Sequence, residues 1–313
     1  MAGEVVEVGS HITRFKTSDR VIGHAIGQAE NHNSPSEGAF QTFTVLQAHM
    51  TSPIPSDLSY EKASVIPLAV STASCGLFQK DMLALQHPST HSEPTGKTLL
   101  IWGGSTSVGS NAIQLAVAAG HDVFTTASPK NFGFVKSLGA AKAFDYNGTT
   151  VVADLVQAFE GKITIGALSI GPGSADSCMS VLSKCKGNKL IATANYFVPS
   201  TPPKRFVTLR TIYYFISWSI SHWIKSKTTG VNYKFIFGTT LIDNGVGKAI
   251  YEDYLPEALA DGKFVAAPEP VIAGRGLESV QKWIRQAEAR LVSEKRGCLS
   301  IAQRMINGSR EEI

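Results

Sequence analysis

Apolar residues follow two different patterns along the chain. Before residue 70, short β-rich runs between Gly, Ser, Asn and Pro turns predict strands near 4–8, 19–27 and 39–46. From 98 to about 195, five short apolar runs alternate with helical stretches. Strands joined by helices predict an α/β fold with a doubly wound parallel sheet that helices cover on both faces.

The change of pattern also predicts how the chain is divided. Its 313 residues are enough for two domains. We expect a β-rich domain at 1–75, a nucleotide-binding domain at 76–240 and a C-terminal segment, 241–313, that packs back against the first domain. One more strand is expected at 233–238.

A long helix is expected at 206–224, where apolar residues recur every three or four positions. The segment approaches the length of a bilayer span, but an arginine inside a span is costly, and Arg210 lies within it. A buried or pocket-lining helix is therefore favoured over a transmembrane one. The apolar stripe comprises Phe206, Leu209, Tyr213, Ile216, Ile220 and Trp223.

Composition limits the classes of function. Apolar residues make up 43% and charged residues 17% of the chain, which excludes a disordered protein. The formal net charge of +4 is too small for a dedicated nucleic-acid binder. Four cysteines without a CxxC pair, and an N-terminus without a basic or apolar leader region, predict a cytoplasmic protein.

The first strand of the alternating region leads into a Gly-rich turn and then a helix. Gly104 and Gly109 fill the first and third glycine positions of the GxGxxG pattern, and Thr106 stands at the second. Such a turn presents backbone N–H groups and the helix dipole to a pyrophosphate, and the hydroxyls of Ser105 and Ser107 add donors. The strand–turn–helix context predicts dinucleotide binding, and a plain Gly-rich turn is the alternative.

The end of the next strand favours NADPH over NADH. An NAD site presents Asp or Glu there to the ribose 2′-hydroxyl, whereas this chain has Ser128, Lys130 and Asn131 and no carboxylate. A hydroxyl, an ammonium and an amide can all donate hydrogen bonds to a 2′-phosphate, and the ammonium adds the opposite charge. Ser128 and Pro129 could at the same time begin a helix.

Several motifs together resemble the zinc-free medium-chain dehydrogenase/reductases, among them GEVVEVGS, GAFQTF, SVIPLAVSTA, IWGGSTSVG, SPKNF and SLGAAKAFDY. The resemblance covers nearly the whole chain, and its nearest branch is the fungal enoyl reductases that act in trans with polyketide synthases and their quinone-oxidoreductase-like relatives. It implies a Rossmann domain beside a GroES-like domain, and NADPH-dependent reduction of an activated C=C bond in secondary metabolism. The family has further strands before the segment at 3–10, so the GroES-like domain is expected to be incomplete at its N-terminus, and a non-catalytic NADPH-binding remnant is the alternative.

The resemblance also implies a set of site residues. Those expected to contact the cofactor are Gly104, Ser105, Thr106, Ser107, Val108, Ser128, Lys130, Asn131, Tyr146, Thr193, Ala194, Val292 and Ser293. Those expected to face the substrate are Val70, Ser71, Thr72, Ala73, Leu77, Tyr214 and Trp218.

No metal is expected, because Leu68 stands where zinc-dependent relatives have a cysteine ligand and the cysteines lack the spacing of a metal site. A zinc-type alcohol dehydrogenase is accordingly the less favoured reading. Hydride addition without a metal needs hydrogen-bond donors for an enolate oxygen. Thr72, or a backbone N–H beside it, is the candidate donor, and helix capping is the alternative role for Thr72.

One charge asymmetry bears on partners. Between Asp176 and Asp243 the chain has nine Lys or Arg and no acidic residue. Such a region steers anions, and a solvated face near an anionic cofactor is the alternative reading. The expected partners are a small-molecule or carrier-bound acyl substrate and a polyketide synthase or acyl carrier, with no nucleic acid and no membrane, in a monomer or homodimer.

Overall fold

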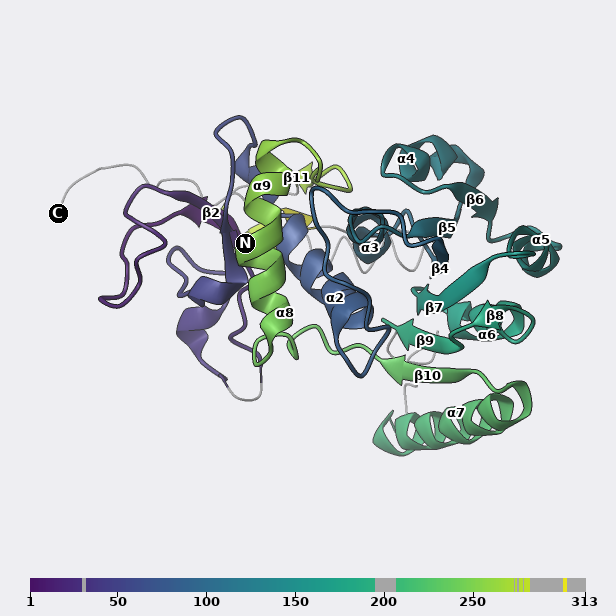
Figure 1. Ribbon diagram of the computed structural model, residues 1–313. Coiled ribbons are helices and arrows are strands. Elements are labelled where there is room, and N and C mark those ends of the chain that lie inside the picture. The colour runs from purple at the N-terminus through teal and green to yellow at the C-terminus, as the bar shows by residue number, and fades with distance from the viewer. Residues whose placement is uncertain are drawn as a thin grey trace.

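Two sheets of different kinds organise the protein, and helix α2 (Ile66–Phe78) lies between them (Figure 1). The computed structural model describes residues 1–29, 32–194, 207–272, 274, 276–277, 279–281 and 301–302. The smaller sheet is antiparallel and is built from the first 53 residues. The larger sheet is parallel and contains the strands that the alternating pattern predicts.

The larger sheet follows the order β10-β9-β7-β4-β5-β6, with β8 beside β7, and every pairing in it is parallel. The chain starts at β4, moves outward on one side and then outward on the other, which is the doubly wound Rossmann order. The order reverses between β4 and β7. The predicted fold class is therefore confirmed. The strands are β4 (Lys97–Trp102), β5 (Asp122–Ala127), β6 (Lys142–Asp145), β7 (Ile163–Ser169), β8 (Lys186–Gly187), β9 (Leu190–Thr193) and β10 (Asn232–Phe235).

Helices cover both faces of this sheet because its central strands are apolar on both sides. Every residue of β4 after Lys97 is buried. On one face α2, α3 and α4 share a continuous apolar core with β4 and β5, and on the other face α5 and α6 form a second core. The helices are α3 (Ser107–Ala118), the short η3 (Pro129–Asn131), α4 (Phe132–Ser137), α5 (Val151–Ala158), α6 (Ser174–Leu182) and α7 (Val207–Thr229).

The antiparallel sheet pairs β1 (Ala2–Glu4), β2 (Arg20–Gly23) and β3 (Thr51–Pro53). The strand predicted at 39–46 is wrong, because this segment is an irregular loop in which Phe40 and Phe43 are exposed. The Gln41 side-chain amide donates to three carbonyl groups, those of Pro35, Ser36 and Gly38, so the loop is closed by its own polar contacts rather than by a ladder. Short helices accompany this sheet: η1 (Pro35–Glu37), η2 (Ala48–Met50) and α1 (Tyr60–Ala63).

The segment after the parallel sheet turns back toward α2 and the antiparallel sheet. The Tyr251 hydroxyl donates to the carbonyl of Pro67 (2.9 Å) and lies 2.8 Å from the Ser71 hydroxyl, both on α2. Arg14 and Glu252 form an ion pair of 3.0 Å. The domain boundaries themselves stay a prediction. The segment comprises α8 (Gly245–Lys248), a π-helical stretch η4 (Ala249–Tyr254), α9 (Leu255–Ala260) and β11 (Val271–Ile272), which pairs with β12 (Ile301–Ala302).

Helix α7 exists as predicted, but the expectation that its apolar stripe is buried is wrong, and a pocket-lining role stays a prediction. Five of the six stripe residues are exposed, and the sixth, Phe206, lies outside the described residues. The helix instead turns Trp218 and His222 toward β10. In the described part of the chain, no helix has the length and apolarity that a membrane crossing requires. The exposed stripe residues are Leu209, Tyr213, Ile216, Ile220 and Trp223.

Candidate active site

The Gly-rich turn joins the carboxyl end of β4 to α3. Gly103 adopts a φ of +89°, in the left-handed region that favours glycine. Its N–H donates to the Thr126 hydroxyl (3.0 Å), and the Gly104 N–H donates to the Thr126 carbonyl (2.9 Å). The neighbouring strand β5 thus holds the turn in place.

The turn packs directly on the first turn of α3. A Cβ on Gly109 would lie 2.2 Å from the Gly103 carbonyl oxygen, and a Cβ on Gly104 would lie 2.1 Å from the Thr125 hydroxyl. Thr106 caps the helix, because its hydroxyl donates to the Gly103 carbonyl (2.7 Å) and accepts from the Gly109 N–H (3.0 Å). This close approach leaves the N-terminus of α3, with its partial positive charge, behind a tight backbone turn.

The end of β5 carries the polar residues that the sequence assigns to a 2′-phosphate. The Ser128 hydroxyl lies 3.5 Å from the hydroxyl of Tyr146, which follows β6. Ser128 precedes η3, but its side chain makes no capping hydrogen bond there, and Lys130 is exposed. The acidic residue at the end of β6, Asp145, is engaged by its own loop, since it accepts from the Asn147 N–H (3.0 Å).

The topology brings most of the predicted cofactor residues to one edge of the sheet. β4, β5 and β6 are consecutive neighbours, so the segments at 104–108 and 128–131 and Tyr146 follow adjacent carboxyl ends. Thr193 is the last residue of β9 and Ala194 follows it, and β9 is separated from β4 by β7. The remaining two candidates, Val292 and Ser293, lie outside the described residues. Cofactor contact by each of these residues stays a prediction.

Two buried hydroxyls at this edge have no hydrogen-bond partner among the described residues. They belong to Ser169 and Thr193, which are direct neighbours on β7 and β9. Leaving a buried polar group unpaired costs about 1–3 kcal/mol. A polar ligand that bonds to these hydroxyls would therefore remove this free-energy penalty. Sequence reasoning named Thr193 but missed Ser169. The feature that could have identified Ser169 is its place at the end of a strand beside β4, where the strand order reverses.

Helix α2 presents only part of the predicted substrate-facing set to solvent. Val70, Ala73 and Leu77 are fully buried in the core, and the Ser71 hydroxyl is engaged with Tyr251. Thr72 is half-buried, and its hydroxyl donates to the Leu68 carbonyl one turn earlier (2.9 Å). Thr72 lies within the helix, so the alternative role as its cap is wrong.

The exposed side of α2 holds residues that sequence reasoning did not assign to the substrate. Leu68 is exposed one helical turn before Thr72, and Phe237 is exposed in the loop after β10. A Cβ on Gly238 would lie 3.0 Å from the Thr72 hydroxyl, so this loop passes close to Thr72. Burial raises the pKa of the Cys75 thiol, on the same helix, to about 11, which keeps it protonated and unreactive as a nucleophile near neutral pH.

The two aromatic candidates on α7 lie apart from this group. The Trp218 ring stacks on His222 with a centroid distance of 3.7 Å and meets the rings of Tyr233 and Phe235 on β10. This packing accounts for the position of Trp218 without a substrate. For Tyr214 the structure describes the backbone only. Substrate contact by either residue stays a prediction.

Comparison with known proteins adds to this geometry. No protein-family model matches the chain. It is 54% identical over 296 residues to dehydrogenase pigH of Monascus ruber, an alignment that covers 94% of this chain and 80% of pigH. It is 33% identical over 288 residues to trans-enoyl reductase himH of Aspergillus japonicus, covering 91% of this chain and 75% of himH. The chain belongs to the medium-chain dehydrogenase/reductase family.

Solved structures agree with this medium-chain fold. The CurK enoyl reductase superposes with a TM-score of 0.61 over 97% of this chain and 77% of CurK, at 17% identity. The quinone oxidoreductase of Escherichia coli, crystallised with NADPH, superposes with a TM-score of 0.61 over 92% of this chain and 77% of that protein, at 19% identity. At these identities the likeness establishes the fold. The fungal relatives, which are named dehydrogenases and trans-enoyl reductases, make this medium-chain dehydrogenase/reductase an oxidoreductase near the enoyl reductases.

Histidines and cysteines in this medium-chain reductase are dispersed or otherwise engaged. Among the described residues, no three His, Cys, Asp or Glu side chains gather in a way that could hold a metal ion. His32 pairs with Glu37 at 3.0 Å, and His49 lies 2.9 Å from the Ile242 carbonyl oxygen. Cys178 and Cys185 are buried in the apolar core under α5 and α6.

Proposed function

We propose that this protein is an NADPH-dependent reductase that adds hydride to the activated C=C bond of an enoyl thioester, an enone or a quinone, without a metal. One observation carries the proposal. The glycine turn at 103–109 lies on the N-terminus of α3, beside a strand end that offers Ser128 and Lys130 and no carboxylate. The named activities of the trans-enoyl reductase and quinone oxidoreductase relatives support it.

The residues at this edge fit a phosphorylated dinucleotide. The missing Cβ atoms of Gly104 and Gly109 allow the backbone to form a tight cradle before α3. In the proposed complex, the segment 105–108 holds the pyrophosphate, Ser128 and Lys130 hold the 2′-phosphate, and Tyr146 flanks the adenosine. The unpaired hydroxyls of Ser169 and Thr193 offer donors farther along the same edge. When bound, the cofactor supplies the hydride.

The chain's own residues position the acceptor and stabilise its developing charge. Hydride addition to the β-carbon of an enone moves charge to the carbonyl oxygen, which a hydrogen-bond donor stabilises. Thr72 is the proposed donor, and its hydroxyl would rotate away from the Leu68 carbonyl to act. The exposed side chains of Leu68 and Phe237 offer apolar contacts for a substrate held against α2.

The experiment is a test of acceptors with NADPH, followed by the loss of absorbance at 340 nm. We expect oxidation of NADPH with a crotonyl thioester or a quinone and none with simple aldehydes. Turnover with aldehydes alone would instead indicate an alcohol dehydrogenase. Binding of NADPH without turnover of any acceptor would favour the non-catalytic reading.

Two further comparisons sharpen the assay. Thr72→Val is expected to lower kcat at least tenfold while the Kd of NADPH stays unchanged, because the hydroxyl acts on the substrate.

We also propose that the acyl group arrives on a carrier protein. A crotonyl group on an acyl carrier should then give a higher kcat/KM than crotonyl pantetheine.

A further inference from the structure

Helix α7 is attached to the protein through one narrow face. On that face the stacked rings of Trp218 and His222 both meet Tyr233 of β10 edge-on, at centroid distances of 5.3 and 5.4 Å. β10 is the last strand of the parallel sheet, so α7 lies beyond the edge of the main body (Figure 1).

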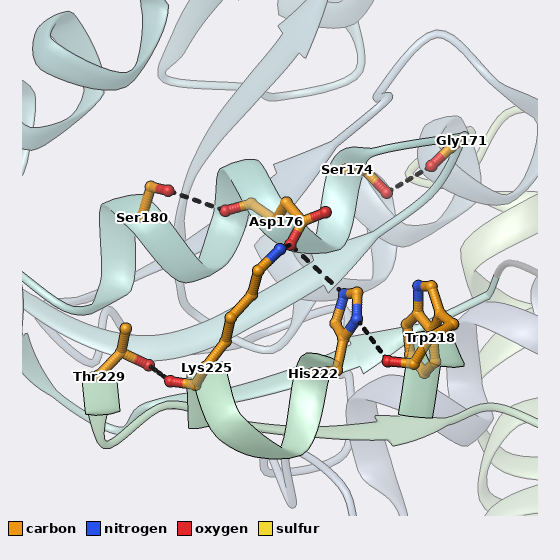
Figure 2. Close-up of polar contacts among 8 residues, drawn as sticks. All are labelled: Gly171, Ser174, Asp176, Ser180, Trp218, His222, Lys225 and Thr229. Atoms are coloured by element: carbon orange, nitrogen blue, oxygen red, sulfur yellow. Dashed lines mark hydrogen bonds and ion pairs between the residues drawn. The ribbon is translucent and has the colours of Figure 1, made fainter. Parts of the chain in front are cut away.

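A polar contact with α6 fixes the rotation of α7 about its own axis. Figure 2 shows Asp176 of α6 between Lys225 and His222 of α7. A carboxylate oxygen of Asp176 accepts from the Lys225 ammonium at 2.6 Å and lies 3.4 Å from Nε2 of His222. The ring stack and this carboxylate together determine which side of the helix faces away.

The side that faces away is apolar from Leu209 to Ile224, and the exposed Lys227 follows on the same side about one turn later. At about 100° per residue, seven large apolar residues fall within an arc of about 120° opposite Trp218 and His222. Their exposed fractions run from 50% to 74%. The residues of this outward stripe are Leu209, Ile212, Tyr213, Ile216, Ile220, Trp223 and Ile224.

This orientation is the reverse of the usual one, in which the apolar stripe of a surface helix faces the core. At roughly 150–250 Å² per aromatic side chain, Tyr213 and Trp223 alone expose roughly 200–340 Å², and five Leu and Ile residues that are at least half exposed add to this area. The largest apolar patch of an ordinary monomer is about 300–600 Å² and is often functional. The outward stripe is therefore large enough to be a binding surface.

The charges on α7 indicate what kind of surface it meets. The helix carries Arg210, Lys225 and Lys227 and no acidic residue, and the sequence has none between Asp176 and Asp243. Asp176 neutralises Lys225, whereas Arg210 and Lys227 are exposed near the two ends of the helix. An anionic partner suits this charge distribution.

We propose that α7 binds the surface of an anionic phospholipid bilayer, lying in the plane of the headgroups with the outward stripe immersed. Helices that bind in this way have one apolar face with Trp and bulky aliphatic residues and carry basic residues beside it. Tyr213 and Trp223 are the residue types that favour the membrane–water interface. The proposal concerns a helix that lies on a membrane without crossing it, and it replaces the expectation of no membrane partner.

A second copy of this chain fits the outward stripe less well. In an antiparallel pair of α7 helices, Lys227 of one copy lies near Arg210 of the other, and in a parallel pair each cation meets its own counterpart. Neither arrangement supplies an acidic residue from α7. A long, straight ridge also suits a deformable lipid surface, whereas a protein would need a matching groove.

The test is co-sedimentation of the whole protein with vesicles of phosphatidylcholine alone and of phosphatidylcholine with 30% phosphatidylserine, a composition of our choosing. We expect at least tenfold stronger binding to the anionic vesicles. The variant Tyr213→Ser/Ile220→Asn/Trp223→Ser should lose binding at least a hundredfold. Arg210→Gln/Lys227→Gln should weaken binding to anionic vesicles about twentyfold, since each basic residue near such a surface contributes about fivefold.

The matched control is Phe40→Ser/Phe43→Ser, which removes two exposed aromatic rings far from α7 in the sequence and should leave binding unchanged. Circular dichroism melting verifies that each variant is folded. The proposal is overturned if the protein sediments with neither vesicle, or if the stripe variant binds like the original protein. If the protein does not bind vesicles, and if sedimentation velocity shows that the stripe variant is a monomer where the original protein is a dimer, the stripe would be assigned to a second copy. Stripe-dependent binding of an acidic acyl carrier protein without vesicle binding would assign it to that protein.

Discussion

The sequence predicts both α3 and α7 as helices with apolar residues, but their surroundings are opposite. α3 begins on the glycine turn, connects two adjacent strands and is buried from Gly109 to Ala116. α7 precedes the edge strand β10, and its stripe points outward. The comparison teaches that periodicity predicts a helix with an apolar face, whereas the neighbouring elements decide what covers that face. For α3 the protein itself covers the face, and for α7 we propose a lipid surface.

The largest effect is expected where α3 meets the glycine turn. In Gly109→Ala the new Cβ would lie 2.2 Å from the Gly103 carbonyl oxygen and 2.8 Å from the Gly104 Cα, and neither backbone atom can move without opening the turn. We expect the free energy of unfolding to fall by about 3 kcal/mol or more, with loss of NADPH binding. Denaturant unfolding followed by circular dichroism measures this change.

Gly133→Ala is the matched control, because a Cβ on Gly133, in α4, would meet no atom within 4 Å. It should change the free energy of unfolding by less than about 1 kcal/mol. Equal stability of the two variants would contradict the close packing described for the turn.

The two sides of α7 can be compared with two tryptophans. Trp218→Ala removes a ring packed on His222 and Tyr233, and should lower the free energy of unfolding by about 2–3 kcal/mol. Trp223→Ala removes an exposed ring and should change it by less than about 0.5 kcal/mol. If Trp223→Ala were the more harmful of the two, the orientation of α7 would be wrong.

How far the sequence predicts this fold depends on how local the deciding interactions are. β4, β5 and β7 are short runs buried on both faces, so apolarity alone reveals them. The segment 39–46 is also a short β-rich run, yet Gln41 closes it into a loop through contacts that the sequence pattern does not reveal. Which side of α7 faces outward depends on Asp176, more than thirty residues earlier in the chain. The periodicity of the helix itself therefore does not predict its orientation.

The residues of the candidate site also differ in how far the sequence predicts them. The glycine turn and the end of β5 are contiguous segments, so spacing locates them. The pairing of Ser169 with Thr193, and the engagement of the Ser71 hydroxyl by Tyr251, depend on which strands and helices become neighbours. The sequence therefore predicts the cofactor edge better than it predicts the surface offered to a substrate.

The charge at the end of β5 is tested by Lys130→Glu. Replacing an ammonium by a carboxylate beside the proposed 2′-phosphate should raise the Kd of NADPH about 10- to 100-fold and leave the Kd of NADH nearly unchanged. Lys136→Glu, an exposed lysine six residues later, is the control for net charge. An unchanged Kd of NADPH in Lys130→Glu would place the 2′-phosphate elsewhere.

The smallest effect concerns two buried histidines, one in each region. Burial lowers the pKa of His24 from 6.5 to about 4, and no partner for its Nδ1 exists among the described residues. Burial also lowers the pKa of His222, but the Asp176 carboxylate acts in the opposite direction. His24 should therefore contribute more to acid lability than His222.

The direction of this pH dependence follows from the difference in proton binding between the folded and the unfolded chain. Between pH 6.5 and pH 4 the unfolded chain protonates His24 and the folded chain does not, so stability falls as the pH falls. We expect His24 to account for about 1 kcal/mol of the loss between pH 7 and pH 5.5. Unfolding free energies across this range should vary less with pH in His24→Gln than in the original protein or in His222→Gln. An equal slope in all three would refute the assignment.

The most direct test of the central claim is a fluorescence titration of the unmodified protein with NADPH and with NADH. A turn at 103–109 that cradles a pyrophosphate, beside a strand end that recognises a 2′-phosphate, predicts saturable binding of NADPH with a Kd at least tenfold below that of NADH. Absence of binding by either nucleotide, or equal affinity for both, would contradict it.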